Sequence, residues 1–191
     1  LGGPIIQNKL FFFVNAEIER RDDPATSWVA DRGVEGDNVS RVLASDLDQL
    51  SSYLNSNFKY DTGPYQGYDF EIPARRYLGK LDYNLNDRNK ISVRYTQLDS
   101  TTDQLVSDSS SLGFGSRRTR TTALNFANSN YKILENIKSG VAEWNSILGT
   151  NKSNSLIVGY TYQDESRESV GEFFPMVDIL NAGTVYTTFG F

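Results

Sequence analysis

The sequence of 191 residues contains neither cysteine nor histidine. It therefore offers no thiol or imidazole for catalysis, no disulfide, and none of the ligands of the common zinc sites. A Ser-His-Asp or Cys-His catalytic site is excluded within these residues. The lack of cysteine does not fix the compartment, but it suits a protein that crosses the periplasm without pairing thiols.

Long hydrophobic runs are missing as well. The longest strongly apolar run extends from Leu10 to Val14, whereas a membrane helix needs about 20 residues. This excludes a helical span but not a β-barrel, whose strands carry a weaker signal. The net charge of −5, from 19 Lys and Arg against 24 Asp and Glu, gives no electrostatic attraction to nucleic acid.

Signals of enzymatic or metal chemistry are weak. Gly113–Ser116 lacks the lysine and the spacing of a phosphate loop, and Asp69 with Glu71 resembles a glycosidase pair without an enclosed cleft. Five aspartates in loops near strand ends are conceivable calcium ligands, although none follows an EF-hand spacing: Asp22, Asp23, Asp31, Asp99 and Asp103. We therefore expect no enzyme, no cofactor and no metal site.

A small basic cluster, Arg117, Arg118 and Arg120, lies in a predicted loop. It is either a solvated loop, which is the commoner case, or a contact for anionic lipopolysaccharide or a ligand. The residues that touch a ligand cannot be assigned from the sequence.

Aromatic residues are abundant, with 11 Tyr and 11 Phe, which is typical of β-structure and of barrels with aromatic girdles. Five segments alternate apolar and polar residues with period two, as strands do. They lie near residues 9–19, 75–84, 89–99, 137–148 and 155–165. Short turns and long connections (22–73, 100–130 and 166–191) follow each other along the chain. We expect Gly2–Asn8 to be the end of another short turn.

This asymmetry predicts an all-β, antiparallel up-and-down meander of five or six strands with bare edges, a fragment of a transmembrane β-barrel. The face with Leu10, Phe12 and Val14 would meet lipid, and so would the face with Leu156, Val158 and Tyr160. Charged residues of the opposite faces would point into the lumen: Glu17, Lys80, Asp82, Arg94 and Glu143. Aromatic residues would lie at the head-group boundaries: Phe11, Phe12, Phe13, Tyr83, Trp144 and Tyr160.

One short helix is predicted in the first long loop, on the extracellular side. Ser45–Asp48 reads as a variant of the capping box, and Leu47, Leu50, Leu54 and Phe58 then share one helical face. The helix should end before Asp61. We expect it to pack on its own loop rather than to bind a ligand.

Several strings resemble one family. Leu1-Gly2-Gly3-Pro4-Ile5-Ile6-Gln7-Asn8-Lys9-Leu10-Phe11-Phe12-Phe13 is similar to a motif early in the barrel of TonB-dependent receptors of the Oar-like branch. Further similar stretches are Ser45–Phe58 with Tyr60–Gly63, Arg76–Tyr95, Phe174–Ile179 and Tyr186–Gly190. The resemblance covers most of the chain.

The resemblance implies a barrel of about 22 strands that encloses an N-terminal plug, as transmembrane barrels of this size do. It also implies a cell outer membrane location in a Gram-negative bacterium and TonB-coupled uptake of a bulky nutrient. The partners would be outer-membrane lipid, the protein's own plug, the inner-membrane TonB complex and an extracellular ligand. Neither the plug nor the TonB-contacting segment matches anything in this sequence, and we expect both ends to be cuts in a longer protein.

Two alternatives stay open: a non-transporting adhesion or structural protein of the outer membrane, and a soluble β-sandwich carbohydrate-binding module, which also alternates apolar and polar residues. A signal peptide, a plug and a TonB-contacting motif upstream would favour the receptor. Solubility of the full-length protein without detergent would favour the sandwich.

Overall fold

The computed structural model describes residues 1–109 and 112–191, which form two compact units. One unit consists of Leu1–Arg20, Pro73–Thr101 and Leu134–Ser166, and the other of Arg21–Ile72, Thr102–Ile133 and Arg167–Phe191. Ser110 and Ser111, which belong to the expected connection 100–130, lie outside the described residues. Each unit is built from three segments that are distant in sequence.

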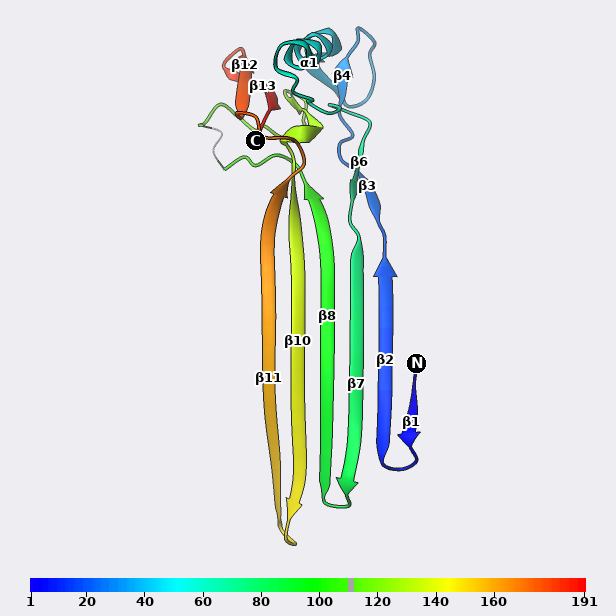
Figure 1. Cartoon of the computed structure of the whole chain (residues 1–191). Helices are drawn as coiled ribbons and strands as arrows, with labels where there is room; N and C mark the ends of the chain where they lie inside the picture. The colour runs from blue at the N-terminus through cyan, green and yellow to red at the C-terminus, as the bar shows by residue number, and fades with distance from the viewer. Residues whose placement is uncertain (110–111) are drawn as a thin grey trace. The chain divides into compact units, whose positions relative to one another are not determined.

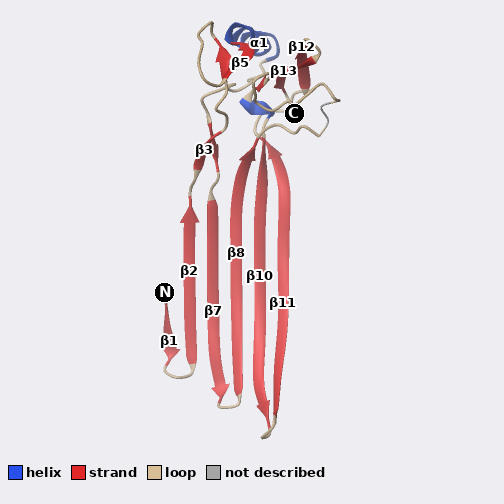
Figure 2. Cartoon of the chain, turned by 180° about the vertical axis from the view of Figure 1, so that it is seen from behind, coloured by secondary structure: helices blue, strands red, loops and turns tan. Residues whose placement is uncertain are grey.

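The first unit contains the body of a six-stranded sheet whose strands follow one another in chain order (Figure 1). The strands are β1 (Gly2–Ile6), β2 (Leu10–Glu19), β7 (Ala74–Asn86), β8 (Asn89–Gln104), β10 (Tyr131–Leu148) and β11 (Lys152–Ser169). This confirms the all-β antiparallel meander. In the described part of the chain the sheet does not close on itself, and β1 and β11 form its two edges (Figure 2).

Short turns join β1 to β2, β7 to β8 and β10 to β11, and all lie at the same end of the sheet (Figure 1). Asn8 (φ 59°) and Gly149 (φ 72°) supply the left-handed conformations that two of these turns require. The long connections all leave from the opposite strand ends. The alternation of short and long connections that the sequence predicted is therefore confirmed.

The strands are longer than predicted at the end from which the long connections leave. β8 continues to Gln104, β10 begins at Tyr131 and β11 continues to Ser169. Residues 99–103 read Asp-Ser-Thr-Thr-Asp, which is typical of loops, but pairing with neighbouring strands overrides this local preference. Gly2–Ile6 is an edge strand instead of part of a turn, and there the missing N–H of Pro4 does no harm.

The second unit corrects the expectation that 22–73, 100–130 and 166–191 are loops. Its short strands are β3 (Asp22–Pro24), β4 (Val29–Asp31), β5 (Val39–Leu43), β6 (Asp69–Glu71), β9 (Leu124–Asn125), β12 (Val177–Asn181) and β13 (Thr184–Phe189). β3 pairs with β6, β4 with β5, and β12, β13 and β9 form a three-stranded sheet. Strands this short carry too little periodicity to stand out in a sequence.

A hydrophobic core holds this second unit together. Leu47, Leu124, Phe126 and Val42 are fully buried, and the ring of Tyr60 stacks on that of Phe174 at a centroid distance of 4.3 Å. The core also includes Ala30, Ala44, Leu54, Tyr186 and Phe189. The stretches Phe174–Ile179 and Tyr186–Gly190 thus contribute to packing. In the following we call this second unit the connection unit.

Helix α1 (Ala44–Phe58) lies where the sequence predicted it and ends before Asp61, with Lys59 in a left-handed conformation. The predicted capping box is wrong, because the helix begins earlier and its N-cap is Leu43. The Leu43 N–H donates to the Tyr186 hydroxyl at 2.7 Å, and that hydroxyl donates to Asp46 at 2.8 Å. A tyrosine from β13 therefore caps the helix, a contact that no local pattern reveals.

Within the predicted apolar face of α1, Leu47 and Leu54 are buried, whereas Phe58 is largely exposed. The Phe58 ring packs edge-on against Tyr53 and Phe174. The helix packs within the connection unit, as expected. No helix among the described residues is long and apolar enough to cross a lipid bilayer.

Candidate functional site

One face of the long sheet carries continuous rows of apolar side chains. Residues directly opposite each other in an antiparallel pair share a face, so the register of the strands defines each row. Across β2, β7 and β8 three rows are Leu10–Tyr83–Ile91, Phe12–Leu81–Val93 and Val14–Gly79–Tyr95, and a fourth, Ala16–Tyr77–Gln97, ends in a polar residue. We call this surface the apolar face.

Strands β10 and β11 continue the apolar face. The Trp144 indole donates to the Asn89 side chain at 3.1 Å, and the hydroxyls of Ser139 and Thr161 lie 2.9 Å apart. Because side chains alternate along a strand, Gly140, Ala142 and Trp144 then share a face with the even-numbered residues of β11. Those residues are Leu156, Val158, Tyr160 and Tyr162. The alternation predicted for both strands is confirmed.

The apolar face is uncovered within residues 1–20, 73–101 and 134–166. Val158 is 61% exposed, Tyr160 is 74% exposed, and Leu81 and Val93 are each 47% exposed. The unit that these residues form consists of the sheet strands and their short turns alone, in a single layer. Soluble monomers rarely expose contiguous apolar patches of more than a few hundred Å². A surface of this kind needs an apolar partner.

The opposite face, which we call the polar face, is lined by charged side chains. Its rows include Phe13–Lys80–Arg94 and Glu17–Arg76–Leu98. Arg76 bridges Glu17 and Glu19 at 2.9 Å each, and Lys80 pairs with Asp82 at 2.9 Å. Sequence reasoning missed the bridging role of Arg76, which lies between two glutamates of the neighbouring strand and depends on the register.

The predicted lumen residues Glu17, Lys80, Asp82 and Arg94 therefore share one face, and Glu143 lies on the same face of β10 by alternation. A hollow of about 390 Å³ on this face is lined by Asn15, Arg76, Leu78, Leu98 and Ile137, among others. It combines apolar walls with an ion pair at its rim. A hollow with this lining can accommodate a peptide segment that has both apolar and charged side chains.

The six residues predicted for the aromatic girdles are divided between the two faces of the sheet. Phe12, Tyr83, Trp144 and Tyr160 lie on the apolar face. Phe11 and Phe13 are opposite Asp82 and Lys80 and therefore belong to the polar face. The alternation within three consecutive phenylalanines makes this unavoidable, because neighbours in a strand point to opposite sides.

The three arginines of the basic cluster do not together form one ligand-binding surface. Arg117 is buried and forms a two-pronged ion pair with Asp178, with its Nε 2.8 Å from Oδ1 and its Nη2 2.7 Å from Oδ2. This hydrogen-bonded carboxylate raises the pKa of the Arg117 guanidinium. Arg118 reaches the Val106 carbonyl at 3.1 Å, and Arg120 is exposed. Arg117 therefore stabilises the connection unit.

The candidate calcium ligands do not come together. Asp23 pairs with Arg21, Asp31 accepts the Gly33 N–H at 2.7 Å, and Asp103 accepts the Glu71 N–H at 3.0 Å. Asp99 lies in β8 and Asp22 in β3, opposite Glu71. Among the described residues no group of three or more acidic side chains is placed to hold a metal ion.

Other weak signals also have structural explanations. Asp69 and Glu71 lie on the short strand β6, and the Phe114 carbonyl in Gly113–Ser116 accepts the Val185 N–H at 2.8 Å. Within the connection unit, burial raises the pKa of Tyr68, whose hydroxyl accepts a hydrogen bond from Asn130 at 3.0 Å. These residues hold segments of the fold together.

The arrangement as a whole presents an uncovered apolar face, a charged opposite face and a separately packed connection unit. No family model matches this chain, and no curated protein or solved structure matches it. Its function is therefore argued from the two faces of the sheet and from the motifs of the sequence.

Proposed function

We propose that this chain forms part of the wall of a transmembrane β-barrel in the outer membrane of a Gram-negative bacterium, in a receptor for TonB-coupled uptake of a bulky nutrient. The observation that carries the proposal is the uncovered apolar face of a one-layer sheet whose opposite face is charged. Lipid tails would cover the apolar face, and the polar face would line the lumen. A soluble sandwich would instead need a second sheet against the apolar face.

The height of the apolar face is compatible with a bilayer. On β7 it runs from Leu85 to Tyr77, nine residues whose eight steps span about 27 Å along the strand. A strand tilt of about 40° reduces this to roughly 20 Å, close to the ~25 Å apolar band of such barrels. Beyond Tyr77, Arg75 ends the apolar row.

The open edges of the sheet are an argument for additional strands on both sides of it. β11 is an edge over Lys152–Ser169, and unpaired edges of this length are a liability in isolation. β1 covers β2 only up to Phe13, beyond which the Val14 N–H reaches the Leu1 carbonyl at 2.7 Å. Neighbouring strands on both sides would satisfy the remaining backbone groups, as closure of a barrel does.

The uptake role rests on the resemblance of the Leu1–Phe13 motif to TonB-dependent receptors. The plug would occupy the lumen beside the polar face, and the TonB complex would act through that plug. The connection unit would face the exterior, where it would hold the ligand. A folded connection unit also suits an adhesion protein, which is the second candidate and differs in lacking transport.

Spin labels on single introduced cysteines test the membrane arrangement: these 191 residues have no cysteine of their own, and any cysteine elsewhere in the full-length protein is replaced by Ser. Leu81→Cys and Val93→Cys probe the apolar face, and Asp82→Cys and Arg94→Cys are matched controls one residue away on the polar face. With the full-length protein in vesicles, we expect collisions with dissolved oxygen at positions 81 and 93. We expect collisions with a water-soluble nickel chelate at positions 82 and 94.

Equal access of the nickel chelate to all four labels would refute the membrane arrangement. Recovery of the full-length protein in solution without detergent would refute it as well. The uptake role has its own test: cells lacking the TonB complex should bind the nutrient at their surface but not accumulate it. Accumulation of the nutrient in cells without TonB would refute the TonB-coupled uptake but not the proposal of a transmembrane barrel.

A further inference from the structure

The short-turn end of the sheet carries more cationic than anionic side chains. Lys9 lies in the turn between β1 and β2, Arg88 in the turn between β7 and β8, and Lys152 directly after the turn between β10 and β11. We call these three residues the cationic rim. The one carboxylate in the three turns is that of Asp87, next to Arg88, and all four side chains are exposed.

The cations of the rim have no anionic partner in the described part of the chain, where the side chains of Lys9, Arg88 and Lys152 form no hydrogen bond or ion pair. The Lys9 Nζ atom lies 6.0 Å from the centroid of the Tyr83 ring. The face of a ring attracts an ammonium but leaves its N–H groups free to donate. The rim can therefore donate hydrogen bonds to an anion.

Tyr83 and Trp144 belong to the last aromatic row of the apolar face before the short turns. The hydrogen bond from the Ile147 N–H to the Arg88 carbonyl, at 2.8 Å, fixes the register of β10 against β8. In this register Trp144 lies opposite Ile91, which in turn lies opposite Tyr83. Tyrosine and tryptophan concentrate where the hydrocarbon of a bilayer meets the head groups, so this row marks one boundary of the proposed bilayer.

Lys152 lies beyond that boundary, on the same face of the sheet. The contact between the Ser139 and Thr161 hydroxyls sets the register of β11, in which Leu156 lies opposite Trp144. Lys152 is four residues from Leu156 and shares its face, about 13 Å further along the strand, or roughly 10 Å after a tilt of about 40°. Its ammonium is therefore level with the head groups of lipids whose tails contact Trp144.

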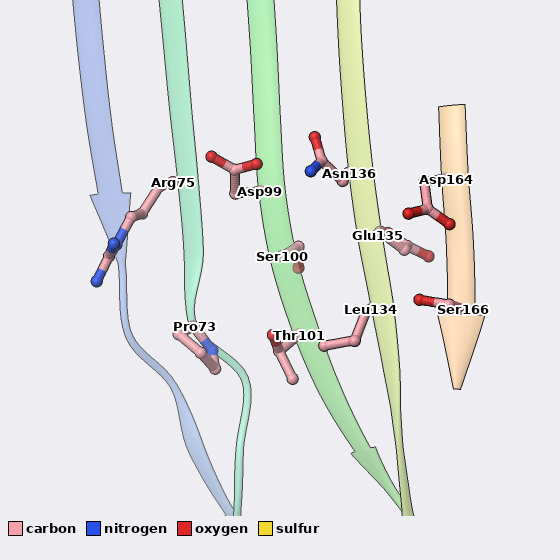
Figure 3. A pocket seen from close by; sticks show the side chains of 10 residues that line it. All are labelled: Pro73, Arg75, Asp99, Ser100, Thr101, Leu134, Glu135, Asn136, Asp164 and Ser166. Atoms are coloured by element: carbon pink, nitrogen blue, oxygen red, sulfur yellow. The ribbon is translucent and has the colours of Figure 1, made fainter. Parts of the chain in front are cut away.

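The other end of the apolar face has the opposite balance of charge. There a hollow of about 410 Å³ is lined by one guanidinium, that of Arg75, and by the carboxylates of Asp99, Glu135 and Asp164 (Figure 3). A head group with a net negative charge is repelled by three carboxylates and attracted by the cationic rim. The charges therefore distinguish the two ends of the apolar face.

We infer that the cationic rim binds the head groups of phospholipids with a net negative charge, in the leaflet that the short turns face. The inference rests on the proposed membrane location, in which short turns face the periplasm. Ammonium and guanidinium groups donate to phosphate oxygens. Phosphatidylglycerol fits the rim, because its phosphate carries an uncharged alcohol. Phosphatidylcholine adds a quaternary ammonium of the same sign as the rim.

Trp144 reports which lipid lies beside it. The full-length protein, with Trp28 and each tryptophan outside these 191 residues replaced by Phe, is reconstituted in vesicles that contain both lipids. Bromine atoms in the acyl chains of one lipid quench Trp144 fluorescence according to the share of that lipid beside it. We expect phosphatidylglycerol to bind there about three- to fivefold more strongly than phosphatidylcholine, the upper range for one exposed ion pair. Salt at about 0.5 M should reduce this preference.

Substitution of Lys152 tests the assignment directly. Lys152→Gln should reduce the preference to about twofold or less, and Lys152→Glu should abolish it or reverse it in favour of phosphatidylcholine. Lys90→Gln is the matched control, because Lys90 is an exposed lysine two residues from Arg88 that lies opposite Asn84 on the polar face. It should leave the preference unchanged.

Equal binding of the two lipids, a preference for phosphatidylcholine, or an equal effect of Lys90→Gln would overturn the inference. Binding of soluble polyglutamate to a protein without lipid preference would assign the rim to an acidic polymer and overturn it as well. The same measurement separates the two proposals. Quenching without lipid preference refutes only the binding at the rim, whereas absence of quenching by either brominated lipid refutes the membrane location of the apolar face.

Discussion

The buried ion pair between Arg117 and Asp178 allows a quantitative prediction. The Asp178 carboxylate meets Arg117 through Nε, 2.8 Å from Oδ1, and through Nη2, 2.7 Å from Oδ2, and it accepts a hydrogen bond from the Thr188 hydroxyl at 2.8 Å. Arg117→Met keeps most of the side-chain volume but removes the positive charge, and among the described residues the carboxylate then keeps the hydrogen bond from Thr188. Breaking a buried pair costs about 3–5 kcal/mol, because an uncompensated charge remains. Asp178 retains 18% exposure, so we expect the lower end, about 3 kcal/mol.

The assay follows unfolding of the connection unit in the full-length protein. The sequence has two tryptophans. Trp28 packs against the connection-unit core and Trp144 lies in the sheet, so Trp144→Phe, with each tryptophan outside these 191 residues also replaced by Phe, makes Trp28 fluorescence the reporter. In that background, Arg117→Met should lower the free energy of unfolding in urea by about 3 kcal/mol, and the double variant with Asp178→Leu should recover most of the loss.

Arg120→Met is the matched control, because Arg120 is an exposed arginine of the same basic cluster. Its effect should stay within about 0.5 kcal/mol. A change of that small size for Arg117→Met would refute the assignment of Arg117 to the packing of the connection unit. If the double variant is as unstable as Arg117→Met alone, the loss of stability does not come from breaking the ion pair with Asp178.

Further predictions concern the helix cap, a close backbone contact, pH and the apolar face. Tyr186→Phe removes the hydroxyl between Leu43 and Asp46 and should cost about 1–2 kcal/mol, measured by Trp28 fluorescence. Gly190→Ala should cost more than about 2 kcal/mol, because its Cβ would lie 2.1 Å from the Pro175 carbonyl oxygen, whereas Gly67→Ala, with open space around it, should cost about 1 kcal/mol. Burial raises the pKa of Tyr68 and Tyr60 in the folded state, so their contribution to the free energy of unfolding is complete below pH about 10 and is lost as the pH rises above it. Tyrosinate absorbance should therefore increase together with the loss of connection-unit structure. Val93→Arg should reduce the yield of membrane-inserted protein, at about 2–4 kcal/mol for a charge in the bilayer centre, while Arg94→Val should not.

Local pattern determined much of this protein. Alternation over Leu10–Ile18 and over Leu156–Tyr162 identified the strands and their two faces, because the side chains of a strand point to opposite sides with period two. The short turns between β7 and β8 and between β10 and β11 followed from Asn, Asp and Gly residues. The predicted helix also appears at its expected place, since its apolar spacing is a property of one segment.

The tertiary structure decided what depends on partners distant in the chain. Arg117 belongs to a basic cluster in sequence, but Asp178, 61 residues away, makes it a buried ion-pair member. The helix cap comes from Tyr186, 143 residues beyond Leu43. Arg76 bridges two glutamates of β2 only because the register places it opposite Glu17. Periodicity along one segment specifies which way a side chain points, whereas the groups that it meets are set by how distant segments pair and pack.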